Sequence, residues 1–391
     1  MNAIVDQSAF ASLAPQTSLF APSPSSDEIA LDPMIQEAAL AGAWFVFSLS
    51  GGKDCGAVSA LANRWLDEIG HPRARRIAMH ADLGRAEWPS TPAQVQAQAD
   101  ALGLPLIVVR ANAGDLPSRF ENRWQRGLAD YEALRLYNLR GPWSSPSLKF
   151  CQSEKKIQVM GPDLSRRLRG EVIVQVTGLR RDESAARRST PVARVDTRFV
   201  KANSRAGTRM LVWNPGVLMT KVDVFAANLR HGIPLSKVYG IGCSRHSCAA
   251  CIMASHDDLV IAGAQEDNAP LFSLYIGWEL SSTFSFQAGA WLADKAPHLL
   301  ADVGAAQLAR AKADAARRKA IEAAMPARHR YVDGWPLYVP DHADAVVIGE
   351  VRAELLGRHN LTNRFATPAA IIDRFSELLD EGQQRRARKA A

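Results

Sequence analysis

The segment Trp44-Phe-Val-Phe-Ser-Leu-Ser-Gly-Gly-Lys-Asp-Cys55 joins an apolar run to a glycine pair, and an amphipathic stretch follows. The apolar run predicts a buried strand, and the apolar stripe over Ala57–Ile69 predicts a helix. Glycines let a backbone approach an anion closely, and the first amides of a helix attract one. The turn therefore predicts a phosphate-binding loop, with an ordinary glycine turn as the alternative interpretation. Its residues are Ser50, Gly51, Gly52, Lys53, Asp54 and Cys55.

Short apolar runs and amphipathic helices alternate along the next part of the chain. Such alternation is typical of right-handed βαβ units, which build a parallel sheet. The expected fold class is therefore α/β, with a parallel twisted sheet and helices on both faces. Strands are predicted at 76–81, 104–109 and 171–177, and helices at 33–41, 91–102 and 221–231.

The two ends of the chain differ from this middle part in composition. The first 32 residues are rich in Ser, Ala and Pro and have no clear period, which predicts a flexible leader. From about residue 259 the pattern is mostly helical, with helices predicted at 305–324 and 367–379. We therefore expect a leader at 1–32, an α/β domain at 33–258 and a mostly helical C-terminal region with a basic tail at 259–391.

The overall composition fits a globular enzyme. The chain has 391 residues, a hydrophobic fraction of 47% and a formal net charge of +7, which is compatible with an anionic substrate. No apolar run approaches the roughly 20 residues that span a bilayer, and no basic region with a long apolar run opens the chain. We expect a cytoplasmic protein without a membrane partner; nothing in the sequence sets an oligomeric state. Five cysteines then indicate thiol chemistry or metal binding.

Four motifs resemble those of a known superfamily, in the same order. Ser50–Cys55 resembles the S-G-G-K-D-S loop of PP-loop proteins, and His80–Pro89 resembles their D-T-G-x-E-x-P segment. Gly178–Arg187 resembles G-x-R-x-x-E-S-x-x-R, and Tyr239–Ile252 resembles Y-x-x-G-x-x-R-x-G-C-x-x-C-I. The chain thus resembles the phosphoadenosine phosphosulfate reductase family of the PP-loop (adenine nucleotide alpha hydrolase-like) superfamily. In style it is similar to the iron–sulfur sulfurtransferases of DNA phosphorothioation systems.

The resemblance implies a nucleotide site. Arg180 and Arg187 would clamp phosphate or sulfate oxygens, because a guanidinium binds them in a bidentate fork, and Glu183 would orient one arginine. Asp82 would end a strand at the sheet edge where ligands bind. The implied catalytic residues are Lys53, Asp54 and Arg180. The implied nucleotide-binding residues are 50–55 with Asp82, Gly178, Arg180, Glu183 and Arg187.

The remaining four cysteines suggest a metal site. Cys248 and Cys251 form C-x-x-C, Cys243 lies just upstream, and Cys151 stands far upstream. Four soft thiolates suit either a [4Fe–4S] cluster or zinc, and the resemblance favours the cluster. Cys55 is interpreted as a loop residue; the alternative is a reactive thiol whose pKa is lowered by Lys53 and the helix N-terminus.

Two reactions fit this resemblance. In the favoured one, ATP with Mg²⁺ adenylates an acceptor oxygen, and nucleic acid is a candidate acceptor. Sulfur from a donor such as a cysteine desulfurase then displaces the adenylated oxygen. The alternative is reduction of an adenylyl sulfate or phosphoadenylyl sulfate, for which related reductases use a cysteine near the C-terminus. No cysteine follows Cys251. A non-catalytic nucleotide-binding subunit is a further alternative.

Aromatic residues offer a second place where nucleic acid could bind. Tyr131, Tyr137 and Trp143 are interleaved with arginines and could stack on bases. A half-buried helix and loop is the favoured interpretation of this stretch.

Overall fold

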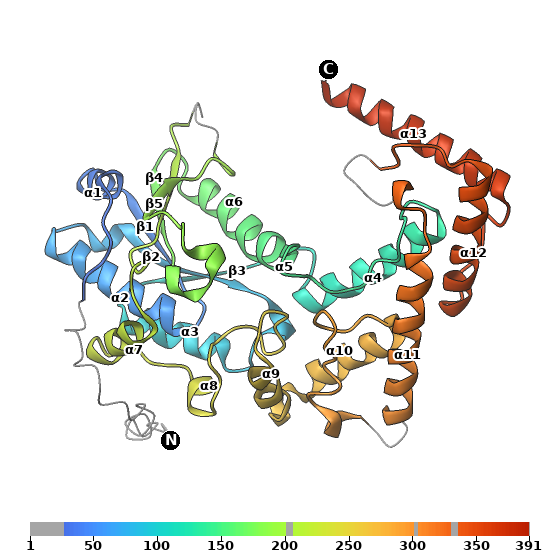
Figure 1. Cartoon of the computed structure of the whole chain (residues 1–391). Coiled ribbons are helices and arrows are strands. Elements are labelled where there is room, and N and C mark those ends of the chain that lie inside the picture. The colour runs from blue at the N-terminus through green and yellow to red at the C-terminus, as the bar shows by residue number, and fades with distance from the viewer. Residues whose placement is uncertain (1–26, 201–205, 301–303, 330–334, 391) are drawn as a thin grey trace. The chain divides into compact units, whose positions relative to one another are not determined.

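The computed structural model describes residues 27–200, 206–300, 304–329 and 335–390 (Figure 1). The chain forms two compact units. The first contains Met1–Leu116 and Ser147–Asn268, and the second contains Pro117–Pro146 and Ala269–Ala391. The second unit thus takes in residues 117–146, a stretch that the sequence placed within the α/β domain.

A six-stranded sheet forms the centre of the first unit, in the order β3-β2-β1-β4-β6-β5. All neighbouring strands are parallel except β5, which runs antiparallel to β6 at one edge. The predicted α/β fold class is confirmed. The strands are β1 (Trp44–Ser48), β2 (Arg76–Asp82), β3 (Leu106–Arg110), β4 (Val172–Val176), β5 (Ala193–Val195) and β6 (Arg209–Trp213).

The strands are apolar because both faces of the sheet are covered. Along β1, Phe45 and Phe47 enter the core that contains residues of α2, α3 and α7, whereas Val46 enters a second core with Leu164 of α6. Helices therefore pack on both faces. The helices of this unit are α1 (Pro33–Leu40), α2 (Lys53–Glu68), α3 (Thr91–Ala101), α5 (Phe150–Gln152), α6 (Gln158–Arg167), α7 (Lys221–Arg230), α8 (Lys237–Gly240) and α9 (His256–Gly263).

The order of the strands places one loop in a special position. β1 is followed in the chain by β2 on one side, while its other neighbour is β4. In open α/β sheets, ligands bind beyond the carboxyl ends of the strands where the order reverses in this way. The loop after β1 and the loop after β4 meet at this point.

The second unit is helical in the residues that the structure describes. Its core packs Trp124 and Tyr131 of the inserted segment against Ile348 and Phe375 from far along the chain. Tyr131, Tyr137 and Trp143 are 0%, 3% and 8% exposed, so these rings belong to the core rather than to a base-stacking surface. The helices are α4 (Leu116–Glu132), α10 (Ala269–Ser282), α11 (Gly304–Ala323), α12 (His342–Arg358) and α13 (Pro368–Ala390).

Across the described part of the chain, we find no helix with the length and apolarity that crossing a bilayer requires.

Candidate functional site

The predicted phosphate loop links the end of β1 to the first residue of α2. Gly51 has a φ of +76°, in the left-handed region that favours glycine. A β-carbon at Gly51 would stand 3.1 Å from Gln94 Cγ and from His246 Nε2, so the turn is also closely covered. Gly52, the N-cap residue, provides no side-chain cap for α2. The turn thus leads directly into a 16-residue helix, and the positive end of the helix dipole lies at the turn.

Asp54 joins the two predicted catalytic cations. Lys53 Nζ donates to Asp54 Oδ2 at 2.7 Å, and Arg180 Nε donates to Asp54 Oδ1 at 2.6 Å. Lys53 and Arg180 are only 5% and 4% exposed. The Lys53 ammonium also lies 5.8 Å from the ring centres of Phe225 and Tyr239. Because these cations are held by one carboxylate and by packing, they are fixed beside the turn.

Gly178 explains how the loop after β4 reaches the loop after β1. A β-carbon there would lie 2.7 Å from Cys55 N and 2.8 Å from Asp54 C, in the first turn of α2. Only glycine permits this approach. Arg180, two residues after Gly178, therefore lies within hydrogen-bonding distance of Asp54.

Several arginines lie in or near the loop after β4. Arg180 also forms an ion pair with Asp182, and Arg187 forms one with Glu183. Burial, then the positive charge of Arg245, lowers the pKa of Arg187 from its usual value, with a further contribution from Arg180. Positive charge is thus concentrated where the resemblance implied an anion. Arg245 was not among the predicted site residues, although it lies in the quoted Tyr239–Ile252 segment.

Cys55 is hydrogen-bonded within the phosphate loop. Its Sγ accepts from Ser50 N at 3.3 Å and donates to Gly52 O at 3.1 Å. Burial raises the pKa of this thiol, which is 7% exposed. The shift is opposite to the lowered pKa that the reactive-thiol alternative required.

Asp82 ends β2, but its partners are not in the phosphate loop. Asp82 accepts from Gly84 N at 2.6 Å and from Arg110 Nε at 3.1 Å. Burial opposes ionisation, yet the bonds from Arg110 and Gly84 keep the pKa of Asp82 below its usual value. Another residue of β2, His80, contacts the chain just before the phosphate loop. Its ring lies 3.0 Å from Leu49 O and 3.3 Å from Glu87 Oε2.

Two of the other predicted metal ligands affect the thiol of Cys248. Burial, then the charge of Cys251, raises the pKa of the Cys248 thiol to about 12, and Cys151 contributes in the same direction. Cys243 is separate, because burial and the charge of Asp258 raise its pKa to about 11. Within the described residues, no three His, Cys, Asp or Glu side chains are arranged to hold a metal ion. Thiolates are the ligands that soft metals prefer, but the described residues do not bring these four cysteines into a metal-binding group.

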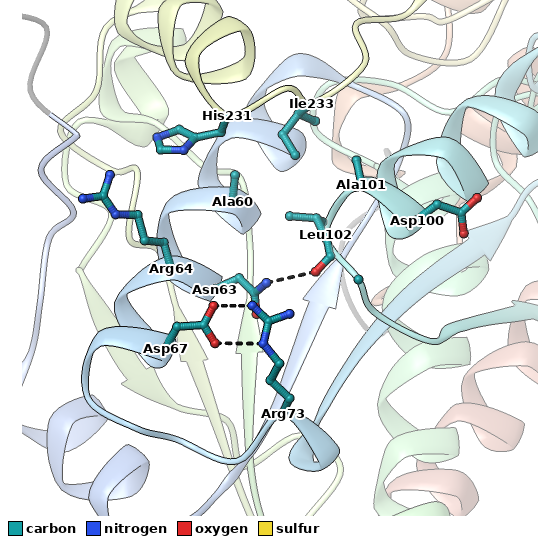
Figure 2. Close-up of a pocket in the computed structure, with 11 residues that line it drawn as sticks. Ala60, Asn63, Arg64, Asp67, Arg73, Asp100, Ala101, Leu102, His231 and Ile233 are labelled. Carbon is teal, nitrogen blue, oxygen red and sulfur yellow. Dashed lines mark hydrogen bonds and ion pairs between the residues drawn. The ribbon is translucent and has the colours of Figure 1, made fainter.

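A hollow of about 310 Å³ elsewhere on the first unit contains none of the predicted site residues (Figure 2). It lies between the second half of α2, the end of α3 and the turn after α7. Its polar groups already have partners: Arg73 binds Asp67 at 2.5 Å, and Asn63 Nδ2 donates to Leu102 O at 3.1 Å. We therefore place the candidate site at the phosphate loop.

One of the comparisons with known proteins covers the part of the chain that contains this loop. A model of the phosphoadenosine phosphosulfate reductase domain matches residues 45–254. A stretch of 131 residues is 31% identical to an uncharacterized 37.8 kDa protein of Escherichia phage 186, covering 32% of this chain and 36% of that protein. A crystal structure of phosphoadenylyl-sulfate reductase from Candida auris, in a phosphate complex, is 13% identical with a TM-score of 0.34. It covers 55% of this chain and 85% of that one. This distant likeness assigns no residue a role.

Proposed function

The chain belongs to the phosphoadenosine phosphosulfate reductase family, and on this premise we propose that it is an ATP-dependent enzyme that adenylates an acceptor for sulfur transfer. One observation carries the proposal. Asp54 holds Lys53 and Arg180 together at the N-terminus of α2, where the strand order reverses. A polyphosphate is the ligand that such fixed cations and helix amides bind best.

Each loop has a separate task in this proposal. The amides of Ser50 and Lys53 already donate to Cys55 Sγ and to the Tyr239 hydroxyl. The amides of Gly51, Gly52 and Asp54 are therefore assigned to the β- and γ-phosphates of ATP with its Mg²⁺, together with the Lys53 ammonium. Arg180, Arg187 and Arg245 are assigned to the α-phosphate, where negative charge develops.

The reaction follows from this division. An acceptor oxygen attacks the α-phosphorus, and the bond from that phosphorus to the bridging oxygen breaks. Pyrophosphate leaves with the electron pair and remains against Lys53 and the loop. A sulfur nucleophile then displaces AMP, which leaves with the acceptor oxygen. Arg180 stabilises the phosphate in both steps, because Asp54 keeps its guanidinium in place.

The cysteines are assigned to a cofactor. We propose that Cys151, Cys248 and Cys251 hold a [4Fe–4S] cluster, or zinc, with Cys243 as the fourth ligand. The effect of Cys251 and Cys151 on the pKa of Cys248 supports this, while the charge that affects the pKa of Cys243 is that of Asp258. A bound cluster would supply redox-active iron–sulfur chemistry. Metal, iron and sulfide analysis of anaerobically purified protein, with an absorption spectrum, tests the assignment.

The decisive experiment measures pyrophosphate release from ATP, with and without a nucleic-acid acceptor. We expect release that needs Arg180, so that Arg180→Lys lowers kcat about 100-fold, because an ammonium cannot replace the fork. The matched control is Arg64→Lys, an exposed arginine on the outer face of α2.

Reduction of an adenylyl sulfate is the competing activity. Release of sulfite from that compound with a reductant, with no turnover of ATP, would refute the proposal.

A further inference from the structure

His246 lies in the cysteine-bearing segment but bonds to groups outside it. Its Nδ1 contacts Ser236 Oγ at 2.7 Å, and its Nε2 contacts Thr91 Oγ1 at 3.1 Å. Thr91 is the first residue of α3 and is 2% exposed, and Ser236 is 1% exposed. Both partners are therefore fixed, and so is the plane of the ring.

The ring also touches the phosphate loop. A β-carbon at Gly51 would lie 3.1 Å from His246 Nε2 and 3.2 Å from its Cε1, so the imidazole edge packs on the glycine itself. Nε2 is thus the atom that both bonds to α3 and faces the turn. Moving the ring would leave Gly51, a residue in the left-handed region, without its neighbour on that side.

The backbone of His246 makes a second connection. Its amide donates to the Tyr239 hydroxyl at 3.3 Å, and the same hydroxyl accepts from Lys53 N at 2.9 Å. The segment that carries Cys248 is thus linked to the first residue of α2 through one oxygen atom. Side chain and backbone of His246 therefore act on the same few atoms of the loop.

We propose that His246 is a positioning residue for the phosphate loop, and that it couples anion binding there to the packing of residues 243–251. The inference rests on the part of the proposed function that has the phosphate loop bind an anion, and it does not require adenylation. His246 contacts no substrate in this scheme. It fixes Gly51 and Lys53 in the geometry that binds pyrophosphate, and an anion that orders the loop also orders the cysteine segment.

The two ring nitrogens can be tested separately. A glutamine amide reaches about as far as Nε2, whereas an asparagine amide reaches only as far as Nδ1. We expect His246→Ala and His246→Asn to weaken the affinity for inorganic pyrophosphate about five- to tenfold, because the Thr91 bond beside Gly51 is lost. His246→Gln should retain most of the affinity. His231→Ala, which removes a histidine that pairs with Asp27, is the matched control.

A second measurement separates positioning from mere stability. In the full-length protein as purified, bound pyrophosphate should slow amide hydrogen exchange across residues 243–251, measured by mass spectrometry. This protection should survive in His246→Gln and disappear in His246→Ala. Thermal unfolding of each variant shows whether the fold is retained, and His246→Gln supplies the folded comparison if His246→Ala is unstable.

The outcomes distinguish the two proposals. If wild-type protein does not bind pyrophosphate, the loop assignment fails and the inference fails with it. If wild type binds but all His246 variants bind equally, or protection is unchanged in them, the loop assignment stands and the positioning role is refuted. Binding and protection that follow the Gln and Asn pattern support the inference even if ATP is never turned over.

Discussion

Gly178 stands where the chain leaving β4 crosses the first turn of α2, and its lack of a side chain sets how closely the two segments lie. In Gly178→Ala the new β-carbon would meet Cys55 N at 2.7 Å, so backbone must move. We expect the free energy of unfolding to fall by about 1–3 kcal/mol, as for other overpacked sites. Pyrophosphate affinity should fall too, because Arg180 shifts away from Asp54. Urea unfolding and calorimetric titration measure the two effects.

The control for this substitution is another glycine. Gly277 lies inside α10, and a β-carbon there would meet nothing within 4 Å. Gly277→Ala should therefore raise the free energy of unfolding by about 0.5–1 kcal/mol and leave pyrophosphate binding unchanged. Equal stability of Gly178→Ala and wild type would mean that the two loops are not in contact.

Cys55 leads to a prediction about pH. Burial raises the pKa of its thiol above the ordinary 9.0, so the thiolate fraction at neutral pH is smaller than that of a free cysteine. Iodoacetamide at pH 7.5 should label Cys55 far more slowly in native protein than in urea-denatured protein, by at least about 100-fold. Because the pKa of the folded protein's thiol is raised, native labelling should continue to rise with pH beyond 9.0, where labelling of a free cysteine levels off. Rapid native labelling at pH 7.5 would restore the reactive-thiol interpretation.

At the scale of elements, α10 carries a buried carboxylate. Glu279 is fully buried and accepts from the amides of Phe286, Leu292 and Ala293 at 2.6, 2.8 and 3.0 Å. Burial raises its pKa to about 7, although these amide bonds oppose the shift. Because the folded pKa exceeds the ordinary 4.5, the native state binds the proton more tightly. The resulting stabilisation is complete below about pH 4.5 and is lost as pH rises through about 7.

Glu279→Gln tests this linkage, because glutamine does not titrate. Wild-type protein should show a free energy of unfolding that falls between pH 5 and pH 8, and the variant should lose that part of the pH dependence. The variant should also be less stable by about 1–3 kcal/mol, since its amide cannot accept all three N–H groups. Parallel pH curves for the two proteins would refute the role of Glu279.

The elements that the sequence predicted are those with strong local signals. The strand before the glycine pair, the strands near 76, 104 and 171, and the helix from Lys221 were predicted from apolar runs and periodicity, and each is present. Two strands were missed: β5, which has three residues and is too short to show a period, and the five-residue apolar strand β6. The stretch around Tyr131 was predicted as a half-buried helix and loop, and α4 is present there. Its full burial was missed, because its apolar residues pack on partners more than 200 residues away, a relation that local periodicity does not contain.

The candidate site shows the same limit. The motifs named the residues of the loop, and the structure joins Lys53, Asp54 and Arg180 as an ion-paired group. Which groups cover the loop could not be predicted, because the contact between His246 and Thr91 spans 155 positions. The site assignments therefore remain predictions that the experiments above can test.

At the scale of the whole molecule, the second unit is built from two separate stretches of chain, and this makes a prediction about truncation. Arg352 Nη1 donates to Tyr131 O at 2.8 Å, and Trp124 packs in the same core as Phe375. A chain that ends at Asn268 would leave the apolar face of α4 in water. We expect it to be largely insoluble, because a patch of that kind promotes association.

Replacing residues 117–146 with a short Gly/Ser linker in the same truncated chain removes the exposed face. We expect this second form to be soluble and to bind pyrophosphate, because the sheet, α2 and the loop after β4 all lie in the first unit. The soluble fraction after expression and calorimetric titration provide the comparison. If the simple truncation is as soluble as the linker form, α4 does not depend on the second stretch. If the linker form is soluble but binds no pyrophosphate while the full chain does, the helical unit contributes to the site.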